Sequence, residues 1–206
     1  MDEFKDRLAA RDPGRRRSLF SGLTGRRGDV SGTTPDRPGV EATRAKIEAA
    51  YGRTSRGALN TKAAAKDLGV SQRTVQRWVA AGGKHSTPRG DRMSALSDRS
   101  RKAATTQAGR RAAMRDMRDS QRGQDLAQRG GSLNVGGRQG VQGKKGFYIR
   151  DRQITLELTP GEVDAMWSAY EEGGDKAVSQ WLTDHADDNY AAGWSFETID
   201  NIEWDR

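Results

Sequence analysis

The segment Thr61–Ala80 reads TKAAAKDLGVSQRTVQRWVA, and its order of residues is typical of a helix-turn-helix. Ala65 is small and stands where two helices must cross closely. Gly69 follows four positions later, where a tight turn needs a positive φ. Ser71 is placed to accept a hydrogen bond from an open amide of a second helix. The segment therefore predicts two short helices joined by a tight turn. An ordinary helical hairpin with a solvated face is the alternative.

The second helix has an apolar side and a polar side. Val75 and Trp78 lie three positions apart and can pack back onto the first helix. Four side chains are then left facing outward: Gln72, Arg73, Gln76 and Arg77. Together with Ser71 of the N-terminal turn they form the predicted DNA-binding site. Arg suits the acceptor edge of guanine and Gln suits the edge of adenine, each through two hydrogen bonds. The pattern predicts a recognition helix whose first turn meets bases in the major groove of DNA.

The composition limits the class of protein. Of the 206 residues, 33% are hydrophobic and 31% are charged, which predicts extended or disordered regions beside small cores. The chain has no Cys, which excludes disulfide and thiol chemistry, and its two His are too few for a typical metal site. No apolar run approaches the length of a membrane span, and no signal-peptide core is present at the N-terminus. We expect an intracellular, cytoplasmic protein that associates with the nucleoid and binds no cofactor.

Charge is distributed unevenly along the chain. Residues 1–150 hold 33 Lys and Arg against 14 Asp and Glu, whereas residues 151–206 hold 3 basic and 14 acidic residues. The basic segment over residues 1–150 predicts a surface that binds nucleic acid. The acidic C-terminal segment predicts a separate module whose charge disfavours contact with phosphate.

The basic segment over residues 1–150 divides into four predicted parts. Residues 1–38 carry Arg clusters, Pro and Gly and predict a flexible arm that follows the DNA backbone. Residues 40–84 form the helix-turn-helix domain, with a supporting helix over 40–51 and a linker over 52–57. Residues 89–122 predict a basic helical segment, either solvated or lying along phosphates. Residues 123–146 include the seven glycines of 130–146 and predict a mobile linker.

Residues 147–206 predict an ordered acidic β-α-α-β module. Ile154, Leu156 and Leu158 alternate with polar residues, as in a half-buried strand. Thr159-Pro160 with Glu162 indicates a helix start. A Gly-Gly pair at 173–174 divides two helical patterns, and apolar residues near the C-terminus indicate one or two closing strands. The predicted fold class is mainly α with this small α+β module at the C-terminus.

Two regions of the chain resemble a known family. Ala64–Val79 is similar to the helix-turn-helix of the terminal proteins that protect the telomeres of linear actinobacterial chromosomes and plasmids. Arg152–Pro160 is similar to that family's strand and helix start, and the stretch from Ala192 to Trp204 resembles its closing strands. The resemblance spans roughly residues 42–206 and is strongest at its two ends.

The resemblance implies a protein primer. Members of the family are linked covalently to the 5′ ends of linear DNA, where a side-chain hydroxyl accepts the first nucleotide and primes end-patching synthesis. The expected partners are telomeric DNA, a telomere-associated protein and a DNA polymerase. The candidate acceptors in the matching zone are Tyr148, Ser132 and Thr155, with Tyr148 and Ser132 ranked first.

Two other classes of function compete with this one. A helix-turn-helix transcriptional regulator, or a plasmid replication or partition factor, would need only the DNA-binding segment and the charge. A recombinase or nuclease would need clustered carboxylates for metals, or a nucleophile with a base. We see no such cluster in the sequence and expect no enzyme.

Overall fold

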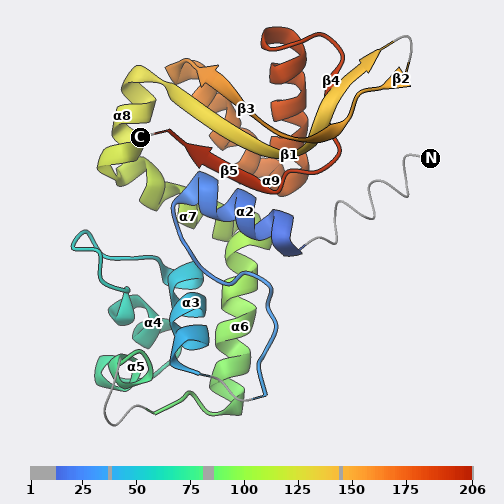
Figure 1. The fold of residues 1–206 in the computed structure, drawn as a ribbon. Coiled ribbons are helices and arrows are strands. Elements are labelled where there is room, and N and C mark those ends of the chain that lie inside the picture. The colour runs from blue at the N-terminus through green and yellow to red at the C-terminus, as the bar shows by residue number, and fades with distance from the viewer. Residues whose placement is uncertain (1–12, 37–38, 81–85, 144–145, 206) are drawn as a thin grey trace. The chain divides into compact units, whose positions relative to one another are not determined.

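The computed structural model describes residues 13–36, 39–80, 86–143 and 146–205 (Figure 1). Its elements, in chain order, are α2 (Pro13–Thr24), α3 (Val40–Tyr51), α4 (Thr61–Asp67), α5 (Gln72–Trp78), α6 (Gly90–Thr105), α7 (Gln107–Asp119), α8 (Gln121–Arg129), β1 (Gly131–Gly143), β2 (Gly146–Phe147), β3 (Arg150–Leu158), α9 (Pro160–Asn189), β4 (Trp194–Phe196) and β5 (Asn201–Trp204). The described chain is mainly helical and has one small antiparallel sheet toward its C-terminus. This confirms the predicted fold class at that level.

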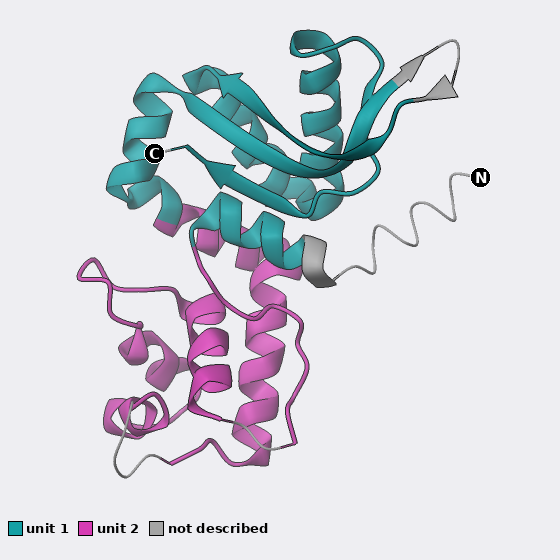
Figure 2. Cartoon of the chain, viewed as in Figure 1, with its two compact units in different colours: residues 1–25, 117–206 teal, residues 26–116 magenta. Residues whose placement is uncertain are grey.

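The chain divides into two compact units (Figure 2). Residues 26–116 form the helical unit. Residues 117–206 and the N-terminal part up to Gly25 form the sheet unit. These divisions differ from the predicted domain limits, because the N-terminal segment and the basic helical segment each contribute to both units.

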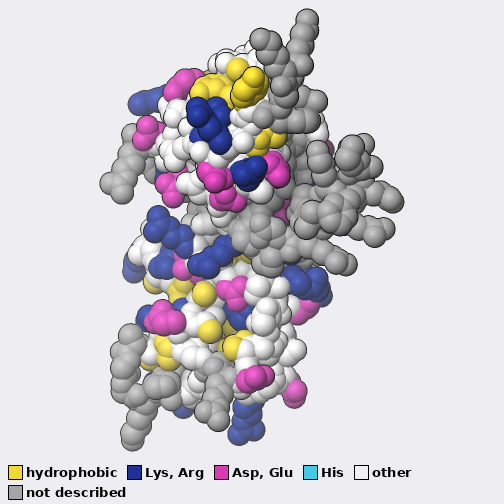
Figure 3. Space-filling model, turned by 45° about the vertical axis from the view of Figure 1, so that its right-hand side comes forward, with side chains coloured by type: hydrophobic (Ala, Val, Ile, Leu, Met, Phe, Trp, Pro, Cys, Tyr) yellow, Lys and Arg dark blue, Asp and Glu magenta, His cyan; other side chains and the backbone are white. Residues whose placement is uncertain are grey.

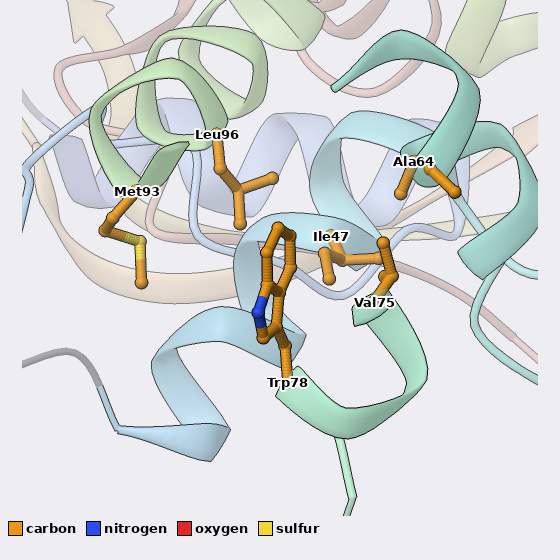
Figure 4. Packing of buried hydrophobic residues seen from close by; sticks show 7 residues of the cluster. Ile47, Ala64, Val75, Trp78, Met93 and Leu96 are labelled. Carbon is orange, nitrogen blue, oxygen red and sulfur yellow. The ribbon is translucent and has the colours of Figure 1, made fainter. Parts of the chain in front are cut away.

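The helical unit is built around α3, which has the predicted limits Val40–Tyr51. Its core gathers apolar side chains from α3, α4, α5 and α6, so α6 is packed and is not a solvated rod. Figure 4 shows the indole of Trp78 lying between Leu96 and Ile47, with Met93 nearby. The buried members of this core are Ile47, Ala64, Ala65, Val75, Trp78, Met93 and Leu96.

Two buried cations fasten the start of the helical unit to its helices. Arg26 is 7% exposed and donates to the carbonyl of Ala49 and to the carboxylate of Asp116. Lys46 is 1% exposed and holds Asp29 at 2.7 Å. Residues 26–30 were predicted as part of a flexible arm. They are instead fixed by partners that lie far along the sequence.

The sheet unit is organised by β1, which pairs antiparallel with every other strand described. Along β3 the register places Ser132 opposite Glu157 and Asn134 opposite Thr155. On its other edge β1 pairs with β4 and β5. α9 packs against β3 and β4 and lies behind the sheet in Figure 1, and α2 packs against β5.

The predicted linker over 123–146 is wrong where the structure describes it, and residues 144–145 lie outside the described residues. Residues 121–129 form α8, and residues 131–143 form the central strand of the sheet. The glycines there make room for close contacts. A Cβ at Gly136 would collide with the side chain of Asn201, and one at Gly140 would collide with the backbone oxygen of Tyr148. These positions need the absence of a side chain more than they need flexibility.

The predicted arm over residues 1–38 is also wrong where the structure describes it. Residues 1–12 and 37–38 lie outside the described residues, but residues 13–24 form α2. Leu19, Phe20 and Leu23 are fully buried in the sheet unit. Gly22 lies so close to Ile202 of β5 that a Cβ there would collide with its backbone. α2 is therefore part of the core of this unit.

The acidic C-terminal module agrees with its predicted order of elements. Thr159 and Glu162 form a reciprocal capping box at the start of α9. The helix is interrupted at Gly174, whose φ of 68° is left-handed, so its two halves match the two predicted helices. Two short closing strands, β4 and β5, follow.

Candidate nucleic-acid interface

The turn between α4 and α5 is built by local hydrogen bonds. Asn60 caps α4 by accepting from the amide of Ala63 at 3.1 Å. Gly69 takes a left-handed φ of 62°, and the amide of Val70 then donates to the carbonyl of Ala65. Ser71 caps α5, its Oγ accepting from the amide of Thr74 at 3.1 Å. The cap at Ser71 and the turn at Gly69 that were proposed from the sequence are thus present in the structure.

The two sides of α5 are separated as the sequence indicates. Val75 and Trp78 are buried in the core of the helical unit. The five side chains of the predicted site are all exposed: Ser71, Gln72, Arg73, Gln76 and Arg77. Ser71 uses its hydroxyl for the cap, which leaves the Gln and Arg side chains as the groups available to a ligand.

The first turn of α5 is linked to the first turn of α4. The Nε2 of Gln72 donates to Oγ1 of Thr61 at 3.2 Å. Arg73 and Arg77 present guanidinium groups to solvent on the same short helix. Guanidinium and carboxamide groups spaced along one exposed turn can form paired hydrogen bonds with base edges.

A groove lies beside α5 within the helical unit. It has a volume of about 630 Å³ and is lined by Arg27, Glu41, Arg44, Ala45, Glu48, Arg53, Ala58, Leu59, Thr61, Gln76 and Val79. Gln76 therefore belongs both to the exposed face of α5 and to the wall of the groove. Sequence reasoning missed the groove, because its walls come from four separate segments and carry no common motif.

The three candidate hydroxyls lie in different surroundings in the sheet unit. Ser132 is on β1 and not in a mobile loop, and its hydroxyl donates to both carboxylate oxygens of Glu157 at 2.8 Å. Thr155 lies on the outer face of β3, as predicted, and its hydroxyl donates to Asn134 at 2.6 Å. Tyr148 lies between β2 and β3 with 57% of its surface exposed. The outer face of the sheet therefore brings Ser132 and Thr155 onto neighbouring strands.

The surface shown in Figure 3 mixes charges of both signs. Lys and Arg side chains lie among Asp and Glu side chains in that view, without a field of one sign. On this face the described side chains form no continuous basic patch.

Within the described residues, no group of three His, Asp or Glu side chains is arranged to hold a metal ion. His85 lies outside these residues, and His185 is buried on α9, with Nδ1 3.5 Å from Glu162. None of the helices in the described ranges combines the length and hydrophobicity that a membrane-spanning segment needs.

Comparison with models of protein families, with curated protein sequences and with solved structures found no match to this chain.

Proposed function

We propose that the helical unit is a helix-turn-helix domain that binds duplex DNA and recognises its sequence through α5. The observation that carries this proposal is the exposed face of α5, where Gln72, Arg73 and Arg77 project from a helix that is capped by Ser71 and packed through Trp78. A short, rigid helix of this kind fits the major groove, which is about 12 Å wide.

The experiment that tests this proposal compares the affinity of the protein for a preferred DNA sequence with its affinity for DNA of unrelated sequence. A duplex selected by the wild-type protein from a random pool is measured against a scrambled duplex. We expect Arg73→Ala or Gln72→Ala to cost about 1–3 kcal/mol on the selected duplex and little on the scrambled one. Lys102→Ala is the matched control, because Lys102 is an exposed cation on α6 that pairs with Asp98. Equal losses on both duplexes for Arg73→Ala would refute the assignment of α5.

The resemblance supports a more specific proposal, that the protein caps the ends of a linear replicon and primes DNA synthesis. In that reaction a protein hydroxyl attacks the α-phosphate of a deoxynucleoside triphosphate and forms a P–O bond. The bond to the β-phosphate breaks, pyrophosphate leaves, and the hydroxyl proton passes to a base. Ser132 is a favourable acceptor, because the carboxylate of Glu157 at 2.8 Å can take its proton. Tyr148 is favourable because of its exposure. Thr155 donates to an amide oxygen, which is a poor base.

Priming is tested with labelled deoxynucleotide, a DNA polymerase and a telomere-associated protein. Label that survives denaturation and disappears in Ser132→Ala, Thr155→Val or Tyr148→Phe would identify the acceptor. Absence of label, with sequence-dependent DNA binding intact, would favour a transcriptional regulator or a plasmid replication or partition factor.

A further inference from the structure

The chain between α3 and α4 forms a small hairpin, which we call the α3–α4 hairpin (residues 52–60). Arg53 and Leu59 form an antiparallel bridge, and the amide of Thr54 donates to the carbonyl of Ala58 at 2.7 Å. The amide of Gly57 donates back to Thr54, and Gly57 has a left-handed φ of 77°. A three-residue loop that ends in a left-handed glycine is a common hairpin closure. Residues 52–57 of this hairpin were predicted as a linker, but they include a defined turn.

A charged side chain fixes the hairpin to α3. Arg53 donates from Nε and Nη2 to the two carboxylate oxygens of Glu48, at 2.9 and 2.7 Å. Its Nη1 donates to the carbonyl of Gly57, on the other side of the loop. Glu48 is 7% exposed and the side chain of Arg53 is 51% exposed, so the base is held by the three hydrogen bonds of Arg53 and not by burial of the pair. The base is therefore rigid, and a ligand at the tip would pay little ordering entropy.

The tip of the hairpin is exposed. Residues 53–58 are all exposed, and Figure 1 shows the loop projecting away from the helices of its own unit. Arg56 is at the tip, and its side chain makes no hydrogen bond or ion pair with any residue that the structure describes. A fixed base with a free cation at the tip is suited to binding an anion outside the protein.

The hairpin flanks the face that α5 presents. Its base closes through the amide of Asn60 and the carbonyl of Gly52, and the next residue, Thr61, accepts from Gln72 of α5. The groove beside α5 has hairpin residues on one wall and Gln76 on another. The three residues from Arg53 to Arg56 span at most about 10 Å, because residues 55–57 form the turn. This upper limit is on the scale of the major groove, which is about 12 Å wide. With α5 in that groove, the hairpin tip can reach the bordering backbone.

The charges along the groove fit a phosphodiester strand. Two carboxylates line the groove, and each forms an ion pair with an arginine of the lining. Glu41 pairs with Arg44, and Glu48 pairs with Arg53. The third arginine, Arg27, is exposed and adds an excess positive charge.

We propose that the α3–α4 hairpin is a second DNA-contacting element, which places Arg56 on a backbone phosphate beside the base pairs read by α5. This inference rests on the DNA binding proposed above. In this arrangement the hairpin positions the protein on the duplex and α5 recognises the bases. Phosphate contacts fix the register of a protein on DNA and carry no sequence information directly.

The test measures full-length Arg56→Ala on the selected and scrambled duplexes over a range of salt concentrations. We expect affinity for both duplexes to fall alike, about five- to tenfold near 0.1 M salt, and the slope of log K against log salt to flatten by about one. Arg56→Lys should retain most of the slope, and Lys102→Ala should change neither quantity. Arg56 is exposed, so thermal unfolding should match wild type.

The outcomes separate this inference from the proposed function. Unchanged affinity and slope in Arg56→Ala, with Arg73→Ala still losing sequence preference, would overturn the hairpin contact and leave α5 as the recognition helix. A loss confined to the selected duplex would overturn the phosphate assignment in favour of base contact. A wild-type protein that binds no duplex would refute both.

Discussion

The side-chain amide of Gln72 donates to the hydroxyl of Thr61, which joins the first turns of the two helices that form the proposed DNA site. The bond restricts the rotamers of a long, exposed side chain before any DNA is present. It uses one amide hydrogen and leaves the other hydrogen and the carbonyl oxygen of Gln72 for a base.

Thr61→Val should therefore weaken base reading without unfolding the protein. The variant keeps the shape of the side chain and removes the acceptor, so the free energy of unfolding should change by about 0.5 kcal/mol or less at this partly exposed position. The preference of the protein for one base over the others at the position contacted by Gln72 should fall. The fall should be smaller than the one caused by Gln72→Ala. Thr61→Ser, which keeps the hydroxyl, is the control. Selection from a random duplex pool measures the preference, and a Thr61→Val profile equal to wild type would show that the bond does not orient Gln72.

Trp78→Ala should destabilise the helical unit by about 3–5 kcal/mol, because it removes a large side chain from a closed core and leaves a cavity. The neighbouring Arg77→Ala is the matched control and should change stability by about 0.5 kcal/mol or less, because Arg77 is exposed. Urea unfolding measures both. A cost below about 1 kcal/mol for Trp78→Ala would contradict the packing of α5 described here.

The helical unit was largely predictable because its signals are local. The cap at Ser71, the positive φ at Gly69 and the apolar pair Val75 and Trp78 all act within one or two helical turns. α3 and the capping box of α9 were predicted for the same reason. The outward position of Gln72 and Arg73 followed once the inward side of α5 was known.

The sheet unit was only partly predictable because its central strand has little strand propensity. β1 contains several glycines, and their role depends on Asn201 and Tyr148, which local sequence does not place beside them. The burial of Phe20 in α2 likewise depends on β5, far along the chain. Glycine at 52 and 57 also indicated a linker. The contact that anchors the hairpin, Arg53 to Glu48, spans five residues across the end of α3 and lies outside the i, i+3 and i, i+4 spacings of a helix surface.

Gly69→Ala should destabilise the helical unit by about 1–2 kcal/mol, because an L-residue is strained at a φ of 62°. Apart from its two neighbours in the chain, no described residue has an atom within 4 Å of the added Cβ, so the expected cost is the strain of the backbone. Gly69→Asn should cost less, because Asn tolerates the left-handed region better than Ala. Thermal unfolding compares the three proteins. Equal stability of the Ala and Asn variants would indicate that the turn rearranges.

Asp29 should make the stability of the helical unit depend on pH. Burial alone would raise the pKa of this carboxyl, but hydrogen bonds from Lys46 and Ser31 outweigh burial and lower the pKa below its ordinary value. A lowered folded-state pKa means that the contribution to stability is fully present above the unfolded-state value, about 3.9, and is lost as pH falls through the folded-state pKa.

Asp29→Asn should cost about 3 kcal/mol at pH 7, because Lys46 is 1% exposed and would keep a buried charge without its carboxylate. The variant should also lose less stability than wild type between pH 5 and about pH 2, since the titrating group is gone. Asp36→Asn is the control, because Asp36 is exposed in the same segment. Urea unfolding at several pH values measures both effects. A variant with the same pH profile as wild type would show that the carboxylate of Asp29 does not stabilise the fold through Lys46.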